Sequence, residues 1–165
     1  MASQLTDRQA RLIISIAGEP GDERVGQAVA EFGAADAVER WESRYGADGM
    51  CKSIDRVLNS PLIEQAVKSL NSVRGRFITP ADDEWPDSLD DLDTAAPVGL
   101  WCTGGGSLAE ISNQALAVVG ARSATAYGQR IAYELGMQGA NENVGIISGA
   151  AYGIDAAAHR GSLAG

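Results

Sequence analysis

Hydrophobic residues recur at helical spacing over the first 75 positions of the chain. The first series surrounds Thr6-Asp7-Arg8-Gln9, which has the form of a capping box at a helix start. Its apolar members are Leu5, Leu12, Ile13, Ile16 and Ala17. Further amphipathic stripes run over residues 25–32, 34–45 and 61–73. The pattern predicts a small helical domain over residues 1–75.

Residues 76–112 follow a different pattern. Two short runs, residues 77–79 and 98–101, have the composition of strands. The stretch between them is acidic and contains prolines. This segment is predicted to be a connector with some strand.

From Gln114 onward, strand and helix patterns alternate. The predicted elements are a strand (115–119), a glycine-containing loop, a helix (126–138), a strand (144–147), a second glycine loop and a helix from Ile154. Such alternation is typical of a parallel α/β sheet. We therefore predict an α/β chain with a helical domain at 1–75. Residues 76–165 are then the connector and the N-terminal part of a Rossmann-like domain, which we expect to be truncated at Gly165.

The net charge of −9 argues at first sight against a nucleic-acid partner, because phosphate binding usually requires a surplus of Lys and Arg. The acidic surplus is local, however. Residues 1–75 carry −2, residues 76–112 carry −7 and residues 113–165 carry no net charge. Exposed charges separated by more than a Debye length of roughly 8 Å are largely screened. The acidic segment between Asp82 and Asp93 therefore does not exclude an anion site elsewhere.

Cysteine and histidine are scarce in this sequence. Cys51, Cys102 and His159 are too few for a metal cluster, and no CxxC pattern is present. We expect reduced thiols, no metal and no cofactor.

The apolar run at residues 12–17 is far shorter than the roughly 20 residues of a membrane span, and no signal-peptide pattern follows it. The sequence thus predicts a cytoplasmic protein with no membrane partner.

The first glycine loop, Gly120-Ala121-Arg122-Ser123, lies between a predicted strand and a predicted helix. Free backbone N–H groups and the helix dipole favour an anion at such a position. A dinucleotide site would need G-x-G-x-x-G, but Arg122 occupies the place of the second glycine. A guanidinium there suits the phosphates of a sugar-phosphate backbone. The alternative is a simple turn in which Arg122 is a solvated surface charge.

The second glycine loop, residues 148–153, also runs from a strand end to a helix start. Because neighbouring parallel strands share one carboxyl edge, the two loops are predicted to form one cleft. Asp155 and His159 are four residues apart and share a helix face, so a local Asp–His pair is the alternative to a ligand role. A hydrolase triad with Ser148 lacks the G-x-S-x-G elbow.

Two long strings in this segment resemble the DNA-processing protein A (DprA/Smf) family. AVVGARSATAYGQRIAYELG is similar to its IVGxRxxxxYG motif, and GIISGAAYGIDAAAHRGSLAG is similar to its SGxAxGIDxxAHxGAL motif. The two strings have the family's order and similar spacing. ERVGQAVAEFGAADAVERW resembles the family's helical, SAM-like domain, and FITPADDEWPDSLDDL resembles its pre-Rossmann strand and D-x-x-YP-x-x-L element. The resemblance extends over nearly the whole chain.

The resemblance implies a competence and recombination factor without catalytic turnover. Such a protein binds single-stranded DNA in natural transformation, helps to load a RecA-type recombinase and forms a homodimer through a C-terminal part that this sequence lacks. The predicted DNA-binding residues are Gly120, Arg122, Ser123, Ser148, Gly149, Tyr152, Gly153, Asp155 and His159. Tyr152 stands where the family often has a basic residue, and its ring offers a surface on which a base can stack.

Two other functions stay open on the sequence alone. One is a Rossmann-like nucleotide-processing enzyme of the phosphoribohydrolase kind, whose PGGxGTxxE motif is absent from these 165 residues. The other is an interaction module in which the helical domain binds a partner. Trp41, Trp85 and Trp101 are interpreted as packing residues, and no DNA contact is expected from the helical domain.

Overall fold

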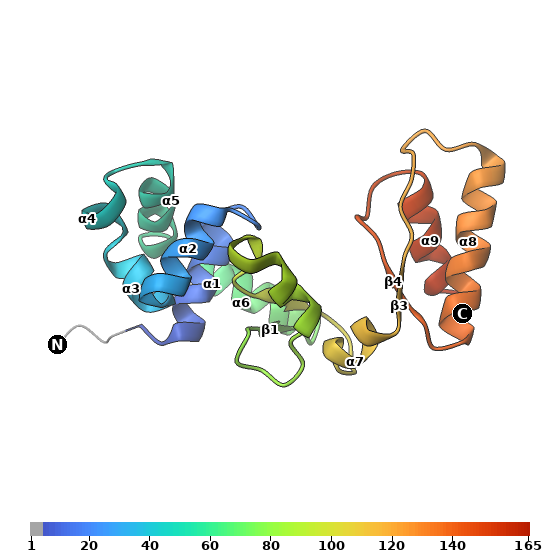
Figure 1. The fold of residues 1–165 in the computed structure, drawn as a ribbon, viewed down its shortest axis with the longest axis horizontal. Helices are drawn as coiled ribbons and strands as arrows, with labels where there is room; N and C mark the ends of the chain where they lie inside the picture. The colour runs from blue at the N-terminus through green and yellow to red at the C-terminus, as the bar shows by residue number, and fades with distance from the viewer. Residues whose placement is uncertain (1–4) are drawn as a thin grey trace. The chain divides into compact units, whose positions relative to one another are not determined.

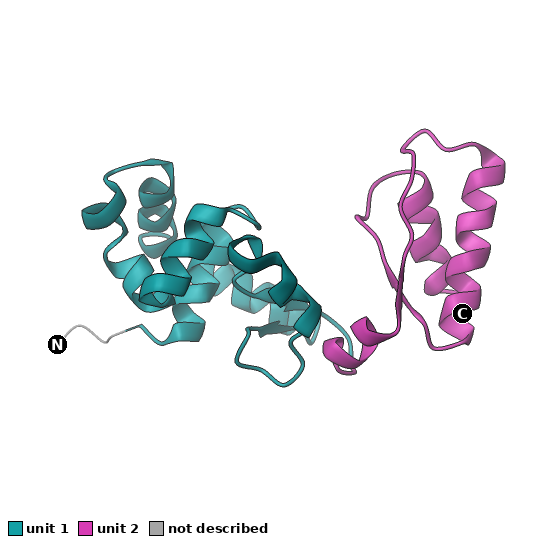
Figure 2. Ribbon diagram, viewed as in Figure 1, with its two compact units in different colours: residues 1–105 teal, residues 106–165 magenta. Residues whose placement is uncertain are grey.

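The computed structural model describes residues 5–165 of the chain (Figure 1). Its internal contacts divide the chain into two compact units, which are coloured separately in Figure 2. Unit 1 is Met1–Gly105, and unit 2 is Gly106–Gly165. Each unit has its own secondary structure and its own cluster of buried apolar residues.

Helices form the first part of unit 1. They are α1 (Asp7–Ala17), α2 (Glu23–Phe32), α3 (Ala34–Glu39), α4 (Trp41–Tyr45), α5 (Gly49–Leu58) and α6 (Leu62–Ser72). The predicted capping box is confirmed, because the Thr6 side chain accepts from the Gln9 N–H and the Gln9 side chain accepts from the Thr6 N–H. Helix α5 was not predicted, and the predicted helical stripe at 34–45 divides into α3 and α4.

The core of unit 1 lies among α1, α2, α3, α4 and α5. Its buried residues are Ala10, Ile13, Ile14, Val25, Ala28, Ala34, Ala37, Val38, Trp41, Met50, Cys51, Ile54 and Val57. Ile13 and Val57 are among the largest fully buried side chains, and each contributes about 1.5–3 kcal/mol by leaving water. Trp41 is buried as predicted, and its ring N–H donates to the Asp48 carboxylate at 3.0 Å. Helix packing therefore stabilises the first part of the chain.

A two-stranded sheet completes unit 1. Strands β1 (Arg76–Ile78) and β2 (Leu100–Cys102) are antiparallel, with Phe77 opposite Trp101. Between them lies a 3₁₀ segment, η1 (Asp87–Ala95), where the sequence predicted only a connector. Trp85 is buried as expected, whereas Trp101 is 40% exposed. The interpretation of Trp101 as a packing residue therefore holds only for the side that contacts Phe77.

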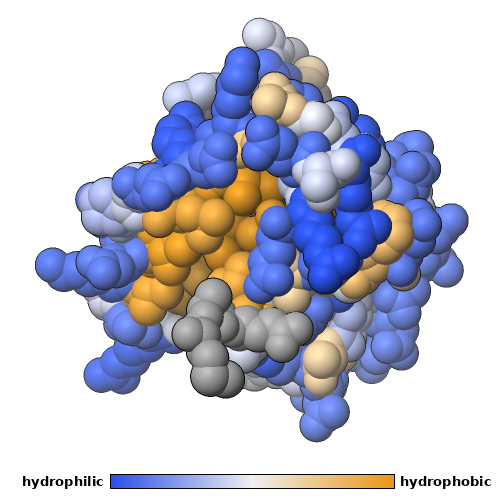
Figure 3. Space-filling view, turned by 90° about the vertical axis from the view of Figure 1, so that its left-hand side faces the viewer, coloured by the Kyte–Doolittle hydropathy of each residue, from blue (hydrophilic) through white to orange (hydrophobic). Residues whose placement is uncertain are grey.

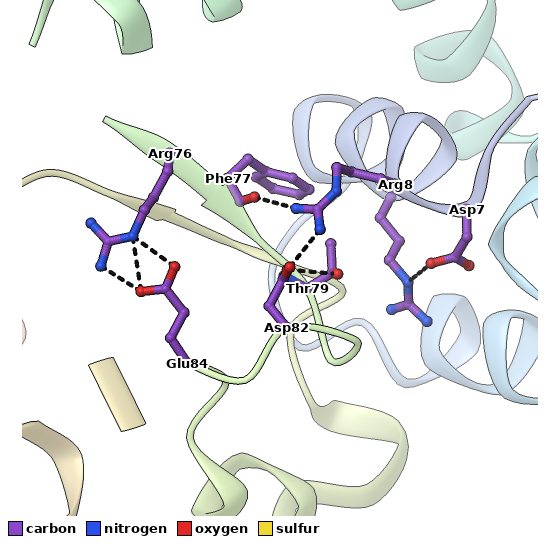
Figure 4. A network of polar contacts seen from close by, with 8 residues as sticks. Asp7, Arg8, Arg76, Phe77, Thr79, Asp82 and Glu84 are labelled. Carbon is purple, nitrogen blue, oxygen red and sulfur yellow. Dashed lines mark hydrogen bonds and ion pairs between the residues drawn. The ribbon is translucent and has the colours of Figure 1, made fainter. Parts of the chain in front are cut away.

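An arginine of α1 holds the acidic segment of unit 1 in place, as Figure 4 shows. Arg8 donates to the Asp82 carboxylate at 2.6 Å and to the Phe77 carbonyl at 2.7 Å. Asp82 also accepts hydrogen bonds from the N–H and the hydroxyl of Thr79, at 2.7 and 3.0 Å. The hydrogen bond from Arg8 is the main cause that lowers the pKa of Asp82, against the opposing effect of burial. The start of the acidic segment is thus folded against α1.

A second arginine–carboxylate pair lies at the other end of β1 (Figure 4). The Arg76 guanidinium donates to both Glu84 carboxylate oxygens, at 2.7 and 2.5 Å. It also donates to the Gly104 carbonyl at 2.7 Å. Residues 76–105 are therefore part of the same compact unit as the helices. The domain boundary that the sequence analysis set at residue 75 stays a prediction.

Some apolar surface of unit 1 is exposed. Figure 3 shows hydrophobic residues gathered in one area of the face drawn, with hydrophilic residues around it. Helix α6 has no fully buried residue, and only its first turn, with Leu62 and Ile63, packs partly against the core. Val67 of this helix and Val73 directly after it are exposed. None of the helices within residues 5–165 is long and apolar enough to cross a membrane.

Unit 2 is a small α/β layer, which confirms the predicted fold class. Its elements are α7 (Leu108–Asn113), β3 (Ala115–Ala117), α8 (Ala126–Asn141), β4 (Gly145–Ile147) and α9 (Ile154–Ser162). Strands β3 and β4 are parallel, with Leu116 opposite Ile146. Helices α8 and α9 lie side by side against the strands (Figure 1), where Val118 and Ile146 pack with alanines of both helices. The chain is thus a helical region followed by an α/β region with a small parallel sheet.

Helices α8 and α9 approach each other at backbone distance through two glycines. A Cβ on Gly136 would lie 2.1 Å from the Ala158 carbonyl oxygen. A Cβ on Gly161 would lie 2.0 Å from the Tyr133 carbonyl oxygen. These contacts are reciprocal, because each glycine faces the backbone of the other helix. The close approach also brings together the starts of the two helices, where the glycine loops end.

Candidate functional site

The two glycine loops of unit 2 follow the carboxyl ends of neighbouring parallel strands, as predicted. Loop 1, residues 118–125, connects β3 to α8, and loop 2, residues 148–153, connects β4 to α9. The loops are in contact, because Gly153 of loop 2 packs on the Ala121 carbonyl, to which the next residue, Ile154, donates its N–H at 3.3 Å. This is the edge of an open α/β sheet at which ligands commonly bind. The geometry therefore brings together the two segments that the sequence analysis selected.

Glycines allow this close contact between the loops. Gly153 has a φ of +86°, and a Cβ there would lie 2.2 Å from the Ala121 carbonyl oxygen and 2.6 Å from that of Arg122. A Cβ on Gly120 would lie 2.7 Å from a side-chain carbon of Ile154. Both contacts are below any normal carbon contact distance. Gly120 and Gly153 are therefore required for the loops to meet, whatever else the loops bind.

Asp155 connects the two loops through hydrogen bonds. Its side chain is buried, with 5% of the residue exposed. Oδ1 accepts from the Gly120 N–H of loop 1 at 3.3 Å, and Oδ2 accepts from the Gly149 N–H of loop 2 at 3.0 Å. The carboxylate therefore points into the junction of the loops and not toward solvent. The sequence placed Asp155 at the correct end of α9 but did not predict this direction.

The surroundings of Asp155 favour its ionised form. Burial raises the pKa of this carboxyl, but interactions with the Ser148 side chain and with the backbone N–H groups of Gly120, Ala151 and Gly149 outweigh burial and lower it. Ser148 acts at close range, although its buried Oγ makes no well-aligned hydrogen bond among the described residues. An ionised carboxylate thus accepts hydrogen bonds from backbone N–H groups of both loops.

Loop 1 exposes a cation. Arg122 and Ser123 are both exposed, and none of the ion pairs found within residues 5–165 involves Arg122. Thr125 caps α8, because its hydroxyl accepts from the Gly128 N–H at 3.1 Å. The first turn of α8 contains no acidic residue, in contrast to that of α9. The start of α8 thus combines a positive helix end with an exposed guanidinium, as an anion site requires.

Aromatic rings are exposed at both loops. Tyr152 of loop 2 is 84% exposed, and Tyr127 in the first turn of α8 is 75% exposed. Tyr127 was not among the predicted site residues. Its signals in the sequence are its place just after loop 1 and its match to the tyrosine of the IVGxRxxxxYG motif. Exposed rings at this edge provide surfaces for stacking.

The remaining predicted residues lie in the same region but have different surroundings. His159 is partly buried on α9, and the Asp155 carboxylate is bound to loop amides, not to the imidazole. The local Asp–His pair considered as an alternative is therefore not formed among the hydrogen bonds of the described residues. Ala150 in loop 2 has a φ of +55°, which is unusual for a residue with a side chain. Such strained backbone is commonly found at functional sites.

Comparison with known proteins gives the same assignment for this region. A family model described as DNA recombination-mediator protein A matches residues 76–165, which include both loops. Two Mycobacterium tuberculosis proteins assigned as DNA processing protein DprA, from strains CDC 1551 / Oshkosh and ATCC 25618 / H37Rv, are 44% identical to the chain over 99 residues. The match covers 54% of this chain and 25% of each relative. The aligned part of the chain thus spans about a quarter of the length of the curated relatives that it matches.

Proposed function

Because the chain belongs to the DNA recombination-mediator protein A family, we propose that it binds single-stranded DNA where loop 1 and loop 2 meet. One observation carries the proposal: the two loops contact each other while Arg122 and Tyr152 stay exposed beside the contact. The pairing of an exposed cation with an exposed ring matches the two needs of single-stranded DNA. These needs are a partner for the phosphates and a surface for the bases.

The phosphate subsite in this proposal is the start of α8. Arg122 supplies a guanidinium, and Ser123 supplies a hydroxyl next to it. The first turn of α8 adds the positive end of a 16-residue helix. No acidic side chain in that turn opposes an anion. The acidic segment of the chain belongs to unit 1, which is a separate compact unit.

The base subsite in this proposal is the exposed ring of Tyr152, with the ring of Tyr127 as a second surface. Stacking on one aromatic ring contributes roughly 1–3 kcal/mol per base and accepts every base. Duplex DNA keeps its bases stacked on one another and needs a broader basic face. Unit 2 contains only Arg122, Arg130 and Arg160 as basic residues besides His159. These features favour single strands.

The wider role that we propose follows from the family and not from the loops. The whole protein would act without catalysis in natural transformation and recombination. It would form a homodimer and help to load a RecA-type recombinase on the bound strand. Ser148, Gly149, Gly153 and His159 complete the proposed DNA-binding surface by their position in and after loop 2.

A salt titration with three variants tests the proposal. Binding of the purified protein to fluorescent poly-dT is measured at several salt concentrations for Arg122→Ala, Tyr152→Ala and Arg130→Ala. Arg122→Ala should weaken binding roughly tenfold and lower the slope of log K against log salt by about 0.7, because one phosphate contact is lost. Tyr152→Ala should weaken binding without changing the slope, because stacking depends little on salt.

Arg130→Ala is the matched control for charge. Arg130 is an exposed arginine of the same unit, but it forms an ion pair with Glu134 at 2.7 Å. Its removal should leave the affinity and the slope at the values of the unmodified protein. Circular dichroism checks that each variant is folded. If folded Arg122→Ala keeps the native affinity and slope, or if a matched duplex binds as tightly as the single strand, the proposed function is wrong.

A further inference from the structure

We infer that Asp155 is a positioning residue whose buried carboxylate ties loop 1 to loop 2 and so sets the spacing between the phosphate and base subsites. This inference rests on the proposed function. It also replaces the direct DNA contact that the sequence predicted for Asp155. The residue acts through the loop backbone and touches no ligand.

The hydrogen bonds of Asp155 carry the first step. Its two carboxylate oxygens bind backbone N–H groups of different loops, Gly120 at 3.3 Å and Gly149 at 3.0 Å. Gly120 is 35 residues away in the sequence, whereas Gly149 is six residues away. One side chain therefore joins two segments that the sheet only places near each other. The backbone hydrogen bond from the Ile154 N–H to the Ala121 carbonyl, also 3.3 Å long, lies beside this side-chain tie.

The burial of Asp155 carries the second step. With 5% of the residue exposed and both oxygens occupied, the carboxylate is turned away from the surface. A carboxylate at the surface would repel the phosphates of DNA, but this one instead accepts from the loop N–H groups of Gly120 and Gly149. The N–H groups of Gly120 and Gly149 are consequently not free to bind phosphate. This leaves the phosphate to the start of α8 and Arg122.

The effect on affinity follows from effective concentration. A DNA strand that bridges Arg122 and Tyr152 binds more tightly when the two subsites are held at one distance. If the loops move independently, the second contact forms at a lower effective concentration. Each single contact then contributes less to the total affinity. Without the hydrogen bonds of Asp155, loss of Arg122 should therefore lower the DNA affinity by a smaller factor.

The test uses Asp155→Asn in the purified protein, with Asp82→Asn as the matched control. An asparagine has nearly the same shape, but its NH₂ group faces one of the two N–H donors and repels it. Asp82 has similar chemistry in unit 1, because it also accepts from a backbone N–H and has a lowered pKa. Affinity for poly-dT is measured for each variant with and without Arg122→Ala.

The expected result is a change in the cost of Arg122→Ala. Arg122→Ala should lower the affinity for poly-dT roughly tenfold in the unmodified protein and in the Asp82→Asn background, but less than about threefold in the Asp155→Asn background. A general loss of stability would not change that ratio. If Arg122→Ala costs the same in all three backgrounds, the positioning role is overturned while the proposed function stands. If Arg122→Ala has no cost in the unmodified protein, the proposed function fails first.

A measurement on the unmodified protein keeps the inference testable if Asp155→Asn does not fold. The amides of Gly120 and Gly149 should exchange with solvent at least about tenfold more slowly than those of Arg122 and Ser123, which donate no hydrogen bond among the described residues. Equal exchange rates would show that the carboxylate does not hold the loops. In a folded Asp155→Asn variant, this protection should be lost at one or both glycines.

Discussion

Gly161 allows a direct test of how α8 and α9 support the two loops. A Cβ at this position would lie 2.0 Å from the Tyr133 carbonyl oxygen, 2.8 Å from its carbonyl carbon and 3.0 Å from the Met137 nitrogen. All three atoms belong to the backbone of α8, so no side-chain rotation relieves the contact. Gly161→Ala therefore requires the two helices to separate.

The size of the effect can be worked from that contact. A carbon–oxygen contact normally needs roughly 3.3 Å, so α8 must retreat by about 1.3 Å along this direction. Overpacking of this kind costs about 1–3 kcal/mol. Alanine regains roughly 0.5–1 kcal/mol over glycine as a helix former. The expected net result is a loss of about 0.5–2 kcal/mol in the free energy of unfolding of unit 2.

Gly128→Ala on α8 is the matched control. A Cβ there would meet only side-chain atoms, at 3.4 Å or more, so alanine should be neutral or stabilise by up to about 1 kcal/mol. Urea unfolding is followed by circular dichroism for both units and by tryptophan fluorescence for unit 1, where all three tryptophans lie. Gly161→Ala should shift only the unfolding transition of unit 2, which circular dichroism reports and tryptophan fluorescence does not. If Gly161→Ala is as stable as Gly128→Ala, the backbone contact does not govern the helix pair.

Three further predictions concern single side chains. Ala150→Gly should be neutral or stabilise by up to about 1 kcal/mol in urea unfolding, because glycine relieves the positive φ of +55°, whereas Ala151→Gly should destabilise by roughly 0.5–1 kcal/mol. The pKa of Asp82 is lowered mainly by the hydrogen bond from Arg8, so the contribution of Asp82 to the free energy of unfolding is present above pH ~4 and is lost as the pH falls through the folded-state pKa. Asp82→Asn should therefore flatten the plot of melting temperature against pH on its acid side. Tyr127→Ala should weaken poly-dT binding with an unchanged salt slope, and an unchanged affinity would exclude this ring from the base subsite.

Local sequence patterns predicted the elements of the fold whose cause is local. The capping box at Thr6 and the order of strand, glycine loop and helix after Gln114 depend on residues within a few positions of one another. Helix α5 was missed although Met50, Ile54 and Val57 have helical spacing. Burial against α1 decided the outcome, and a single sequence does not contain that information.

The acidic segment shows the same limit for side-chain pairing. The run from Asp82 to Asp93 was predicted to be part of a connector because it is acidic and contains a proline. Its partners lie elsewhere, since Arg8 is 74 residues before Asp82 and Arg76 is eight residues before Glu84. Pairing with these arginines holds a segment of like charges in the folded structure of unit 1. Composition gives the charge of such a segment but not the cations that it meets.

The sequence placed Asp155 in the first turn of the last helix, where the structure has it, but left the partners of its carboxylate open. A carboxylate in the first turn of α9 has two sets of partners within reach, the imidazole one turn later or the N–H groups of the loops. The second set is available only because Gly120 and Gly153 let the loop backbones come into contact. Once they do, the two loops present N–H groups to one buried point, and the cost of burying an unpaired anion makes that pairing decisive. The glycines that look like a phosphate motif in the sequence therefore act first on the protein's own carboxylate, and under the proposed function the DNA phosphate is left to the guanidinium beside them.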